Sequence, residues 1–325
     1  MRAVTVPAPG GPDALTLSDV PEPQPAEREV RIRVTAAGVN GADLSQRRGY
    51  YPSPAGAPAW PGLEVSGVVD AVGDAVSDWS VGERVCALLP GGGYAEQVTV
   101  DQGLVLPVPD SVDLVEAAGL PEVTATVWSN VVDLGGLRAG ETLLVHGGSS
   151  GIGSMAIQLA RAFGASVIAT AGSREKADFC RRLGADAAVD YRTDDFVAAA
   201  LAATGGRGVD VVLDIVGGAY IPRDLEALAT GGRIMSIAVR DRTLAAVDMG
   251  MLMSKRARIQ GTTLRARPLA ERTAIIAAVR EHVWPLIADG TVRPVIDAVF
   301  PLEDAAQAHR RMESSAHLGK ILLRV

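Results

Sequence analysis

The chain has 325 residues, of which 48% are hydrophobic and 21% are charged, and its formal net charge is −7. This length predicts about two domains with substantial hydrophobic cores. The negative charge and the low aromatic content of 4% argue against nucleic acid or an anionic membrane surface as a partner.

Two cysteines, Cys86 and Cys180, lie far apart in the sequence and in no metal-ligand spacing. We expect two thiols in a reducing compartment rather than a disulfide framework. The N-terminus lacks the apolar core of a signal peptide, and no apolar run approaches the length of a membrane span. The sequence therefore predicts a cytoplasmic protein.

The first 120 residues alternate short apolar runs with proline and glycine, which predicts a compact, irregular β domain. The expected strands are Ala3–Val6, Val30–Ala36, Val65–Val72, Arg84–Leu89 and Tyr94–Val100. A short helix is expected over Asn40–Arg48, with Asn40 as its cap.

A helical pattern over Asp113–Asn130 precedes a regular alternation of strands and helices that begins at Gly140. This alternation predicts a doubly wound parallel sheet with helices on both faces. The expected strands are Thr142–Val145, Ser166–Thr170, Ala187–Val189, Val209–Asp214 and Arg233–Ala238, and the expected helices include Arg174–Leu183, Asp195–Ala203 and Tyr220–Leu228. A final strand near Ile259–Leu264 leaves this sheet, and an exposed edge there favours a homodimer.

The C-terminal tail is expected to form a helix over Pro268–Ala288, a strand over Ala298–Leu302, a helix over Asp304–Met312 and a last strand over Gly319–Val325. Isolated strands at both ends of the chain indicate that the tail returns to the N-terminal β domain.

A glycine-rich corner at Gly147–Gly153 follows the buried strand Thr142–Val145 and precedes a helical pattern that includes Met155–Ala160. A strand, a glycine turn and a helix in this order are typical of the start of a nucleotide-binding βαβ unit. Glycine lets a pyrophosphate approach the backbone, and the N-terminus of the helix offers unpaired N–H groups. The alternative is a tight turn without a ligand.

The end of the second strand indicates which nucleotide binds. NAD sites place a carboxylate about 20 residues beyond the glycine turn, but Thr170–Lys176 has none at the strand end. Ser173 and Lys176 there supply a hydroxyl and a cation for a 2′-phosphate, which favours NADPH over NADH. Alternatively, Ser173 is a plain helix cap and Lys176 a surface charge.

Matching blocks in the same order cover essentially the whole chain and resemble the medium-chain dehydrogenase/reductase superfamily. The resemblance is to its zinc-independent quinone oxidoreductase branch, which includes zeta-crystallin, and within that branch to the tumour-suppressor-inducible quinone oxidoreductases. The blocks are Ala37–Leu44, Gly62–Val69, Leu88–Ala95, His146–Gly153, Thr170–Ser173, Gly184–Tyr191 and His317–Ile321.

This resemblance implies a GroES-like β domain of residues 1–118 and 265–325 around a Rossmann NADPH-binding domain of residues 119–264, with the cofactor in the cleft between them. It implies a pyrophosphate site at Gly148, Ser149, Ser150, Gly151, Ile152 and Gly153, and a 2′-phosphate and adenine site at Ser173, Lys176 and Tyr191. Thr126 matches a cofactor-proximal threonine, although it is alternatively an ordinary helix residue. Ile237, Ala238 and Leu264 are expected to line the nicotinamide, and Lys320 to approach the cofactor from the β domain.

The sequence differs from the alcohol dehydrogenases of this superfamily at the positions of their zinc ligands. They carry a cysteine ligand where this chain has Asn40 and a histidine ligand where it has Leu63, and the four-cysteine structural lobe is absent. Catalytic zinc needs at least three protein ligands, so no metal is expected. The four histidines, His146, His282, His309 and His317, show no alternative ligand spacing.

Asn40 and Tyr51 are the candidate residues near the reacting centre and the nicotinamide. The Tyr51 hydroxyl is placed to donate to a developing oxyanion, or its ring is a lid that only contacts substrate. Asn40 is a helix cap, a site residue or both. Asp43 and Glu64 are expected to be structural hydrogen-bond acceptors.

These observations favour an NADPH-dependent quinone oxidoreductase that transfers hydride to a small quinone or a related electrophile without a Lewis acid. One alternative is an enoyl or enone reductase of the same superfamily, which acts on carbon–carbon double bonds. Another is a non-catalytic nucleotide-binding or crystallin-like structural protein.

Overall fold

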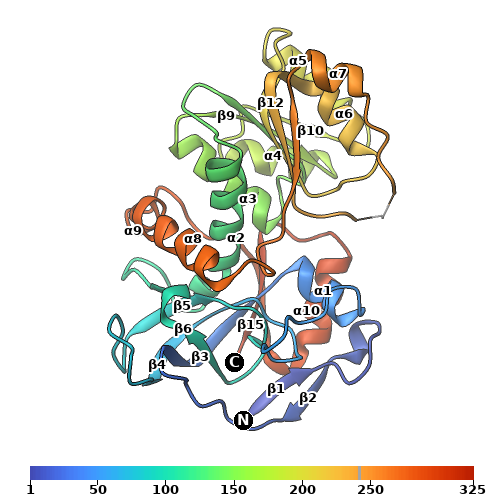
Figure 1. Cartoon of the computed structure of the whole chain (residues 1–325). Coiled ribbons are helices and arrows are strands. Elements are labelled where there is room, and N and C mark those ends of the chain that lie inside the picture. Colours follow the sequence, from blue (N-terminus) through green and yellow to red (C-terminus); the bar gives the residue numbers. More distant parts are fainter. Residues whose placement is uncertain (241–242) are drawn as a thin grey trace. The chain divides into compact units, whose positions relative to one another are not determined.

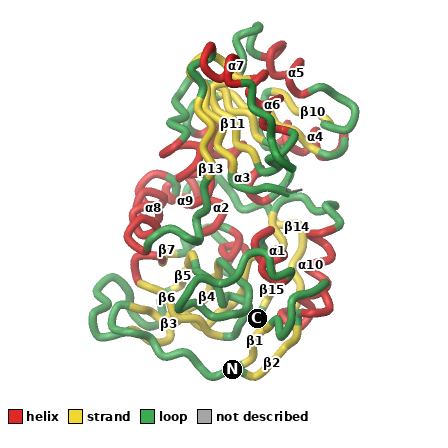
Figure 2. Tube along the Cα trace, turned by 45° about the vertical axis from the view of Figure 1, so that its right-hand side comes forward, coloured by secondary structure: helices red, strands yellow, loops and turns green. Residues whose placement is uncertain are grey.

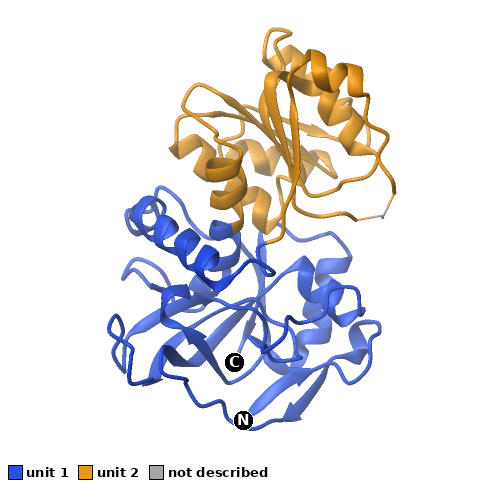
Figure 3. Ribbon diagram, in the orientation of Figure 1, with its two compact units in different colours: residues 1–125, 264–325 blue, residues 126–263 orange. Residues whose placement is uncertain are grey.

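The computed structural model describes residues 1–240 and 243–325. The chain forms two compact units, shown in different colours in Figure 3: unit 1 comprises residues 1–125 and 264–325, and unit 2 comprises residues 126–263. The domain bounds expected from the sequence, after residues 118 and 264, stay a prediction.

Unit 2 is built on a six-stranded, wholly parallel sheet in the order β10-β9-β8-β11-β12-β13. The strands are β8 (Thr142–Val145), β9 (Ser166–Ala171), β10 (Ala187–Asp190), β11 (Val209–Asp214), β12 (Leu228–Ser236) and β13 (Arg258–Gly261). The order turns back on itself between β8 and β11, where the carboxyl ends of the strands leave a crevice in folds of this kind. The strand expected near Ile259–Leu264 is the edge strand β13.

Helices cover both faces of this sheet (Figure 1), as the alternating pattern predicts. They are α3 (Gly151–Ala162), α4 (Arg174–Arg182), α5 (Phe196–Ala203), α6 (Tyr220–Ala227) and α7 (Met249–Ser254). One face packs Leu144 and Ile168 of the sheet against Phe196 and Leu225 of the helices, all of them almost completely buried. Burying a large apolar side chain contributes about 1.5–3 kcal/mol, so the buried strand runs hold this sheet in place.

Unit 1 contains a seven-stranded sheet in the order β14-β15-β3-β4-β5-β7, with β6 also paired to β3 (Figure 2). Its strands are β3 (Glu29–Val39), β4 (Glu64–Val72), β5 (Arg84–Leu88), β6 (Gln97–Asp101), β7 (Val105–Pro107), β14 (Ile296–Pro301) and β15 (Lys320–Arg324). The antiparallel pairing of β15 with β3 returns the C-terminal tail to the N-terminal sheet. A separate hairpin pairs β1 (Arg2–Thr5) with β2 (Thr16–Asp19).

The helices of unit 1 are α1 (Gly41–Arg47), α8 (Leu269–His282), α9 (Trp284–Ala288) and α10 (Ala305–Glu313). The single helix expected over Pro268–Ala288 is wrong, because the helix breaks at Val283 and restarts with Pro285 in its first turn. Proline removes a backbone donor and clashes inside a helix but fits the first turn.

The helical stretch expected over Asp113–Asn130 is also divided. It forms a short 3₁₀ turn at Glu116–Gly119, the helix α2 (Pro121–Val127) and a π-helical segment at Trp128–Leu134. Among residues 1–240 and 243–325, no helix is long and apolar enough to cross a membrane.

Candidate functional site

The glycine corner of unit 2 joins the end of β8 to the start of α3. Gly147 has a φ of +66°, a conformation that side chains rarely adopt. A Cβ atom at Gly153 would lie 2.3 Å from the Gly147 carbonyl oxygen and 2.5 Å from the Gly148 Cα. The turn and the helix therefore pack together only because both positions are glycine.

Residues 148–153 all belong to this turn or to the first turn of α3. Ser150 is the N-cap of α3, and its Oγ accepts a hydrogen bond of 3.0 Å from the Gly153 N–H. The N–H groups at the start of a helix lack partners in the preceding turn and carry partial positive charge. The expected pyrophosphate residues thus lie at the N-terminus of a helix, a kind of position that binds anions in other proteins. Their role toward a pyrophosphate stays a prediction.

His146 fixes this corner from inside the protein, as a residue at the end of a strand. The imidazole is completely buried, with Nε2 2.7 Å from Asp224 Oδ1 and Nδ1 3.0 Å from Thr170 Oγ1. The Gly148 N–H donates to the Thr170 carbonyl oxygen at 2.8 Å. The glycine turn is therefore tied to β9 as well as to β8.

Ser173 and Lys176 follow the end of β9, and Tyr191, directly after β10, lies beside Gly172. Ser173 is the N-cap of α4, and its Oγ accepts from the Lys176 N–H at 3.2 Å. A Cβ atom on Gly172 would lie 2.8 Å from the Tyr191 hydroxyl, and the Tyr191 N–H donates to Ala171. The helix-cap alternative for Ser173 is thus part of the structure, and Ser173 retains a hydroxyl proton to donate.

Asp214, at the carboxyl end of β11, holds the loops at the ends of β11 and β12. The buried carboxylate accepts from the Gly217 N–H at 3.0 Å and from Ser236 Oγ at 3.1 Å. The Ile237 N–H donates to the Asp214 carbonyl oxygen, which places Ile237 and Ala238 directly after β12. This role of Asp214 was not expected from the sequence, although a carboxylate at the end of an apolar strand is a signal for it.

Thr126 and Leu264 lie in different units. Thr126 is buried near the end of α2, where its carbonyl oxygen accepts from Asn130 Nδ2 at 2.9 Å. Leu264, half-buried, begins the C-terminal segment of unit 1 and accepts a backbone hydrogen bond from Arg267. The structure shows where these residues lie, and their roles toward a nicotinamide cofactor stay predictions.

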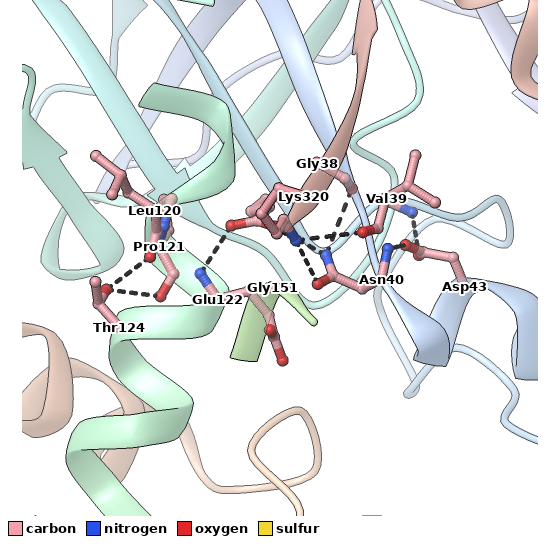
Figure 4. A network of polar contacts seen from close by, with 12 residues as sticks. Gly38, Val39, Asn40, Asp43, Leu120, Pro121, Glu122, Thr124, Gly151 and Lys320 are labelled. Atoms are coloured by element: carbon pink, nitrogen blue, oxygen red, sulfur yellow. Dashed lines mark hydrogen bonds and ion pairs between the residues drawn. The ribbon is translucent and has the colours of Figure 1, made fainter. Parts of the chain in front are cut away.

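Asn40, Glu64 and Lys320 form a buried polar cluster in unit 1 (Figure 4). The Lys320 ammonium group donates to Glu64 Oε1 at 2.5 Å, to Asn40 Oδ1 at 2.7 Å and to the Val39 carbonyl oxygen at 3.2 Å. The Asn40 amide Nδ2 donates to Glu64 Oε1 at 3.0 Å. Glu64 is completely inaccessible to solvent, so the ammonium group is its neutralising partner.

Asp43 is a second buried acceptor beside Asn40. Its carboxylate accepts from the Asn40 N–H at 2.8 Å, the Gly62 N–H at 2.9 Å and the Tyr94 hydroxyl at 3.2 Å. Burial raises the pKa of Asp43 to about 6, against the lowering effect of these backbone hydrogen bonds. Asn40 therefore occupies the cap position of α1, and its side chain also joins the Glu64 cluster. Its role near a reacting centre stays a prediction.

The Asp43 network continues through Tyr94 and His309 to Arg47 at the edge of unit 1. The Tyr94 hydroxyl lies 3.1 Å from His309 Nε2, and Arg47 Nη1 lies 3.1 Å from His309 Nδ1. Since a guanidinium group only donates, Nδ1 accepts, Nε2 carries the proton and the Tyr94 hydroxyl proton points to Asp43. Arg47 also pairs with Glu313.

This network predicts an acid-dependent loss of stability. Burial, followed by the nearby Arg47 and Arg48 charges, lowers the pKa of His309 to about 3 from an ordinary value of 6.5. Between pH 6 and pH 4 the unfolded chain binds one more proton at this residue than the folded chain. The contribution of His309 to the free energy of unfolding therefore falls by about 1.4 kcal/mol per pH unit as the pH falls.

His309→Asn removes this titration but retains a polar side chain. Urea unfolding of both proteins from pH 7 to pH 4 is expected to give a stability difference that shrinks steadily below pH 6. A difference that does not change with pH would show that His309 is protonated in the folded protein.

Tyr51 lies in the loop that follows α1, half-buried and beside Arg265. The Arg265 guanidinium carbon is 5.2 Å from the centre of the Tyr51 ring, and its Nη1 donates to the Tyr51 carbonyl oxygen at 3.4 Å. Burial raises the pKa of Tyr51, and the Arg265 charge acts in the opposite direction. The phenol is thus protonated at neutral pH and available as a donor.

The residues do not assemble a metal-ligand set where alcohol dehydrogenases hold zinc. Asn40 and Leu63, which the resemblance aligns with the cysteine and histidine ligands, offer neither a thiolate nor an imidazole. The Glu64 carboxylate binds the Lys320 ammonium group, and the Asp43 carboxylate accepts from two backbone N–H groups. In the part of the chain that the structure describes, no group of three or more His, Cys, Asp or Glu side chains is arranged to hold a metal ion.

Two family models match different parts of the chain. Residues 26–110 match the alcohol dehydrogenase GroES-like domain, and residues 151–280 match the zinc-binding dehydrogenase family. Together with the parallel sheet, the glycine corner and the β domain, these matches define a medium-chain dehydrogenase/reductase with a Rossmann domain and a GroES-like domain.

Curated proteins and solved structures refine this class. Quinone oxidoreductase from Rattus norvegicus is 34% identical over 99% of this chain and 97% of its own length. The crystal structure of Escherichia coli quinone oxidoreductase complexed with NADPH is 28% identical, with a TM-score of 0.90 over 100% of both chains. The chain therefore belongs to the quinone oxidoreductase branch of the superfamily.

A third relative is much longer. A phenolphthiocerol/phthiocerol polyketide synthase from Mycobacterium tuberculosis is 35% identical over 98% of this chain. The chain spans only 14% of the length of that synthase polypeptide.

Proposed function

We propose that the protein is an NADPH-dependent quinone oxidoreductase that passes hydride to quinones or related electrophiles. The observation that carries the proposal is the glycine corner together with β9, which ends without a carboxylate and is followed by Ser173 and Lys176, in a chain similar along its whole length to quinone oxidoreductases. The first carboxylate after β9, Glu175, lies in the first turn of α4. The experiment is a steady-state assay of NADPH oxidation with 1,4-benzoquinone.

NADPH, when bound, supplies the hydride. The backbone of residues 148–153 would bind its pyrophosphate, and Ser173, Lys176 and Tyr191 would surround its 2′-phosphate and adenine. Thr126, Ile237, Ala238, Leu264 and Lys320 are proposed as further cofactor contacts. The protein then acts mainly by binding and orienting the reactants, which is sufficient when the acceptor is already electron-poor.

If Lys176 binds the 2′-phosphate of NADPH, Lys176→Ala should raise the KM for NADPH. Losing one charge-assisted contact to a 2′-phosphate costs about 1.5–3 kcal/mol, so the KM for NADPH is expected to rise roughly tenfold or more. The KM for NADH should change by less than about twofold, because NADH has no such phosphate. Arg182→Ala, at the other end of α4, is the matched control, and an equal effect of Lys176→Ala on both cofactors would contradict the assignment.

We further propose that catalysis does not use zinc. The support is the chemistry of the cluster: Asn40 and Glu64 bind the ammonium group of Lys320, a cation that the chain itself provides. Dialysis against 1,10-phenanthroline is expected to leave turnover unchanged, whereas activity that is lost and then restored by added zinc would refute this proposal.

Asn40 and Tyr51 are proposed as the residues of unit 1 that contact the nicotinamide and the acceptor. Asn40 is held rigidly by Asp43, Glu64 and Lys320, which suits a residue that fixes the orientation of a ligand. The protonated Tyr51 hydroxyl is suited to donate a proton to a reduced oxygen.

The second candidate function is reduction of an activated carbon–carbon double bond, with a quinone replaced by an enone or enoyl thioester. The similarity to a segment of a polyketide synthase favours this alternative. Assays with 1,4-benzoquinone and with a 2-enoyl thioester, both with NADPH, distinguish the two; turnover of neither acceptor would favour a non-catalytic role.

We also propose a homodimer that forms through the edge of the unit 2 sheet. β13 is an edge strand, and the exposed apolar side chains of Val239, Leu244, Met249 and Met253 precede it in the sequence. An edge strand leaves backbone N–H and C=O groups that a second chain can pair with, and exposed apolar side chains favour a protein contact. Light scattering after size exclusion tests this, with Met253→Glu expected to shift the mass toward one chain.

The expected partners are this second copy and a small molecule, without nucleic acid or a membrane. A cytoplasmic location is proposed because Cys86 and Cys180 are both buried free thiols, as is usual in a reducing compartment.

A further inference from the structure

Arg265 is a buried arginine without a carboxylate partner. It retains only 7% of its surface accessibility, and it forms no ion pair with any residue of 1–240 or 243–325. Burial lowers the pKa of its guanidinium group. Removing an unpaired charge from water is unfavourable in free energy. A protein therefore keeps a buried, unpaired charged side chain chiefly where a ligand supplies the opposite charge.

The contacts of the guanidinium group are all to neutral oxygens. Nε donates to the Pro90 carbonyl oxygen at 2.6 Å, Nη1 to the Tyr51 carbonyl oxygen at 3.4 Å and Nη2 to Ser53 Oγ at 2.9 Å. These contacts use three of the five N–H donors of an arginine. They orient the group, provide no ion pair and leave two of its N–H donors without a hydrogen bond to any described residue.

The surrounding loop is built to hold the group in this position. Ser53 Oγ donates to the Pro58 carbonyl oxygen at 2.7 Å and accepts from Gln46 Nε2 at 3.0 Å. These two hydrogen bonds hold the serine in place independently of Arg265. A Cβ atom on Gly91 would lie 3.0 Å from Arg265 Nη2 and 3.3 Å from Ser53 Oγ. Glycine at this position leaves room for the guanidinium group.

The nearest titratable groups are Tyr51 and Asp43, which are the two that act on the charge of Arg265. The carboxylate of Asp43 is already used by Asn40, Gly62 and Tyr94. Tyr51 lies beside the guanidinium group, at 5.2 Å from its ring centre. A cation from the segment before α8 and a neutral phenol donor from the loop after α1 therefore lie side by side in unit 1.

We propose that Arg265 and Tyr51 form the oxyanion-binding site for the carbonyl oxygen of the acceptor. This rests on the proposed function and assigns the substrate class to quinones and other conjugated carbonyl compounds. The guanidinium group donates to the oxygen on which negative charge develops, and Tyr51 is the proton donor.

The step balances as a two-electron reduction. NADPH, when bound, would supply the hydride that forms a C–H bond at the conjugated carbon of the acceptor, while the π pair moves onto the carbonyl oxygen. The O–H bond of Tyr51 then breaks as its proton passes to that oxygen, and water reprotonates the phenol. For a quinone, the conjugated carbon then loses a proton to water and the second carbonyl oxygen gains one, which gives the hydroquinone. Arg265 stabilises the intermediate charge without exchanging a proton, since a guanidinium group does not deprotonate in proteins.

The test compares Arg265→Met and Arg265→Lys with Arg280→Met, a matched control in which an exposed arginine lies 5.7 Å from the Trp79 ring. Loss of one preorganised oxyanion donor lowers kcat by about 10²–10³-fold. We expect this loss for benzoquinone reduction by Arg265→Met, a partial loss by Arg265→Lys and none by Arg280→Met. The Kd for NADPH should stay within about twofold in all three variants.

A binding measurement that needs no turnover completes the test. 4-Nitrophenol, a coloured mimic of a reduced quinone oxygen, is titrated with and without the holoenzyme. Wild type should bind its phenolate and lower the pKa of the probe by about one unit or more, as an adjacent cation does, and Arg265→Met should not.

The outcomes separate the two proposals. An Arg265-dependent pKa shift without any turnover of quinones would refute the proposed function and retain this site. Quinone turnover that Arg265→Met leaves within threefold of wild type, or an unchanged pKa shift in that variant, would refute the site.

Discussion

Replacing Lys320 with methionine is expected to lower the free energy of unfolding of unit 1 by about 3–5 kcal/mol. Glu64 is completely buried, and Lys320 Nζ lies 2.5 Å from its Oε1. Methionine preserves most of the side-chain volume but leaves the carboxylate charged and without its cation. Three of the four tryptophans, Trp60, Trp79 and Trp284, belong to unit 1, so fluorescence in a urea titration reports mainly on that unit.

The double variant Glu64→Gln with Lys320→Met is the control for this prediction. Glutamine removes the buried charge, and its one oxygen can still accept from the Glu122 N–H. Its NH2 group can donate to Asn40 Oδ1, which Lys320 no longer occupies, so the double variant should recover much of the lost stability. A single Lys320→Met variant within about 1 kcal/mol of wild type would mean that the pair is solvated in solution. The account of the cluster as a substitute for a metal site would then lose its physical basis.

The second large effect is expected from Gly153→Ala in the glycine corner. The new methyl group would lie 2.3 Å from the Gly147 carbonyl oxygen, a distance that real Cβ atoms do not reach, so α3 must move away from the turn. If two hydrogen bonds to the charged pyrophosphate are lost, the cost is at least about 3 kcal/mol. This corresponds to roughly a 100-fold rise in the Kd for NADPH.

Fluorescence titration with NADPH measures this change directly. Gly261→Ala, in β13 of the same unit, is the matched control, because the nearest atom to its Cβ would be 3.9 Å away. Equal NADPH affinity of Gly153→Ala and wild type would place the pyrophosphate elsewhere.

The parts of the fold that follow from local pattern were predictable. The strands over Thr142–Val145 and Val209–Asp214 have the bounds expected from the sequence, because each is a short apolar run between clear turn signals. β12 begins at Leu228 rather than at Arg233, since the chain joins the sheet before the turn at Gly231. The register shift beside β11 that accommodates this turn has no signature in the local sequence.

The candidate site was predictable to different degrees in the two units. The glycine corner, Ser173 and Lys176 lie within one stretch of about thirty residues, so periodicity and residue type place them on two successive strand–helix junctions, β8–α3 and β9–α4. In unit 1, Tyr94 and His309 are 215 residues apart in sequence, and Arg265 is 175 residues from the Pro90 oxygen that orients it. Such contacts depend on how strands and the C-terminal tail pair, which no local pattern specifies.

The central claim is that this chain reduces quinones with NADPH and without a metal ion. The most direct measurement is the steady-state kcat/KM for 1,4-benzoquinone with NADPH and with NADH, on protein stripped of metal by a chelator and analysed for residual zinc. We predict full activity at substoichiometric zinc and a clear preference for NADPH. Absence of NADPH binding, or activity that appears only when zinc is returned, would contradict the account.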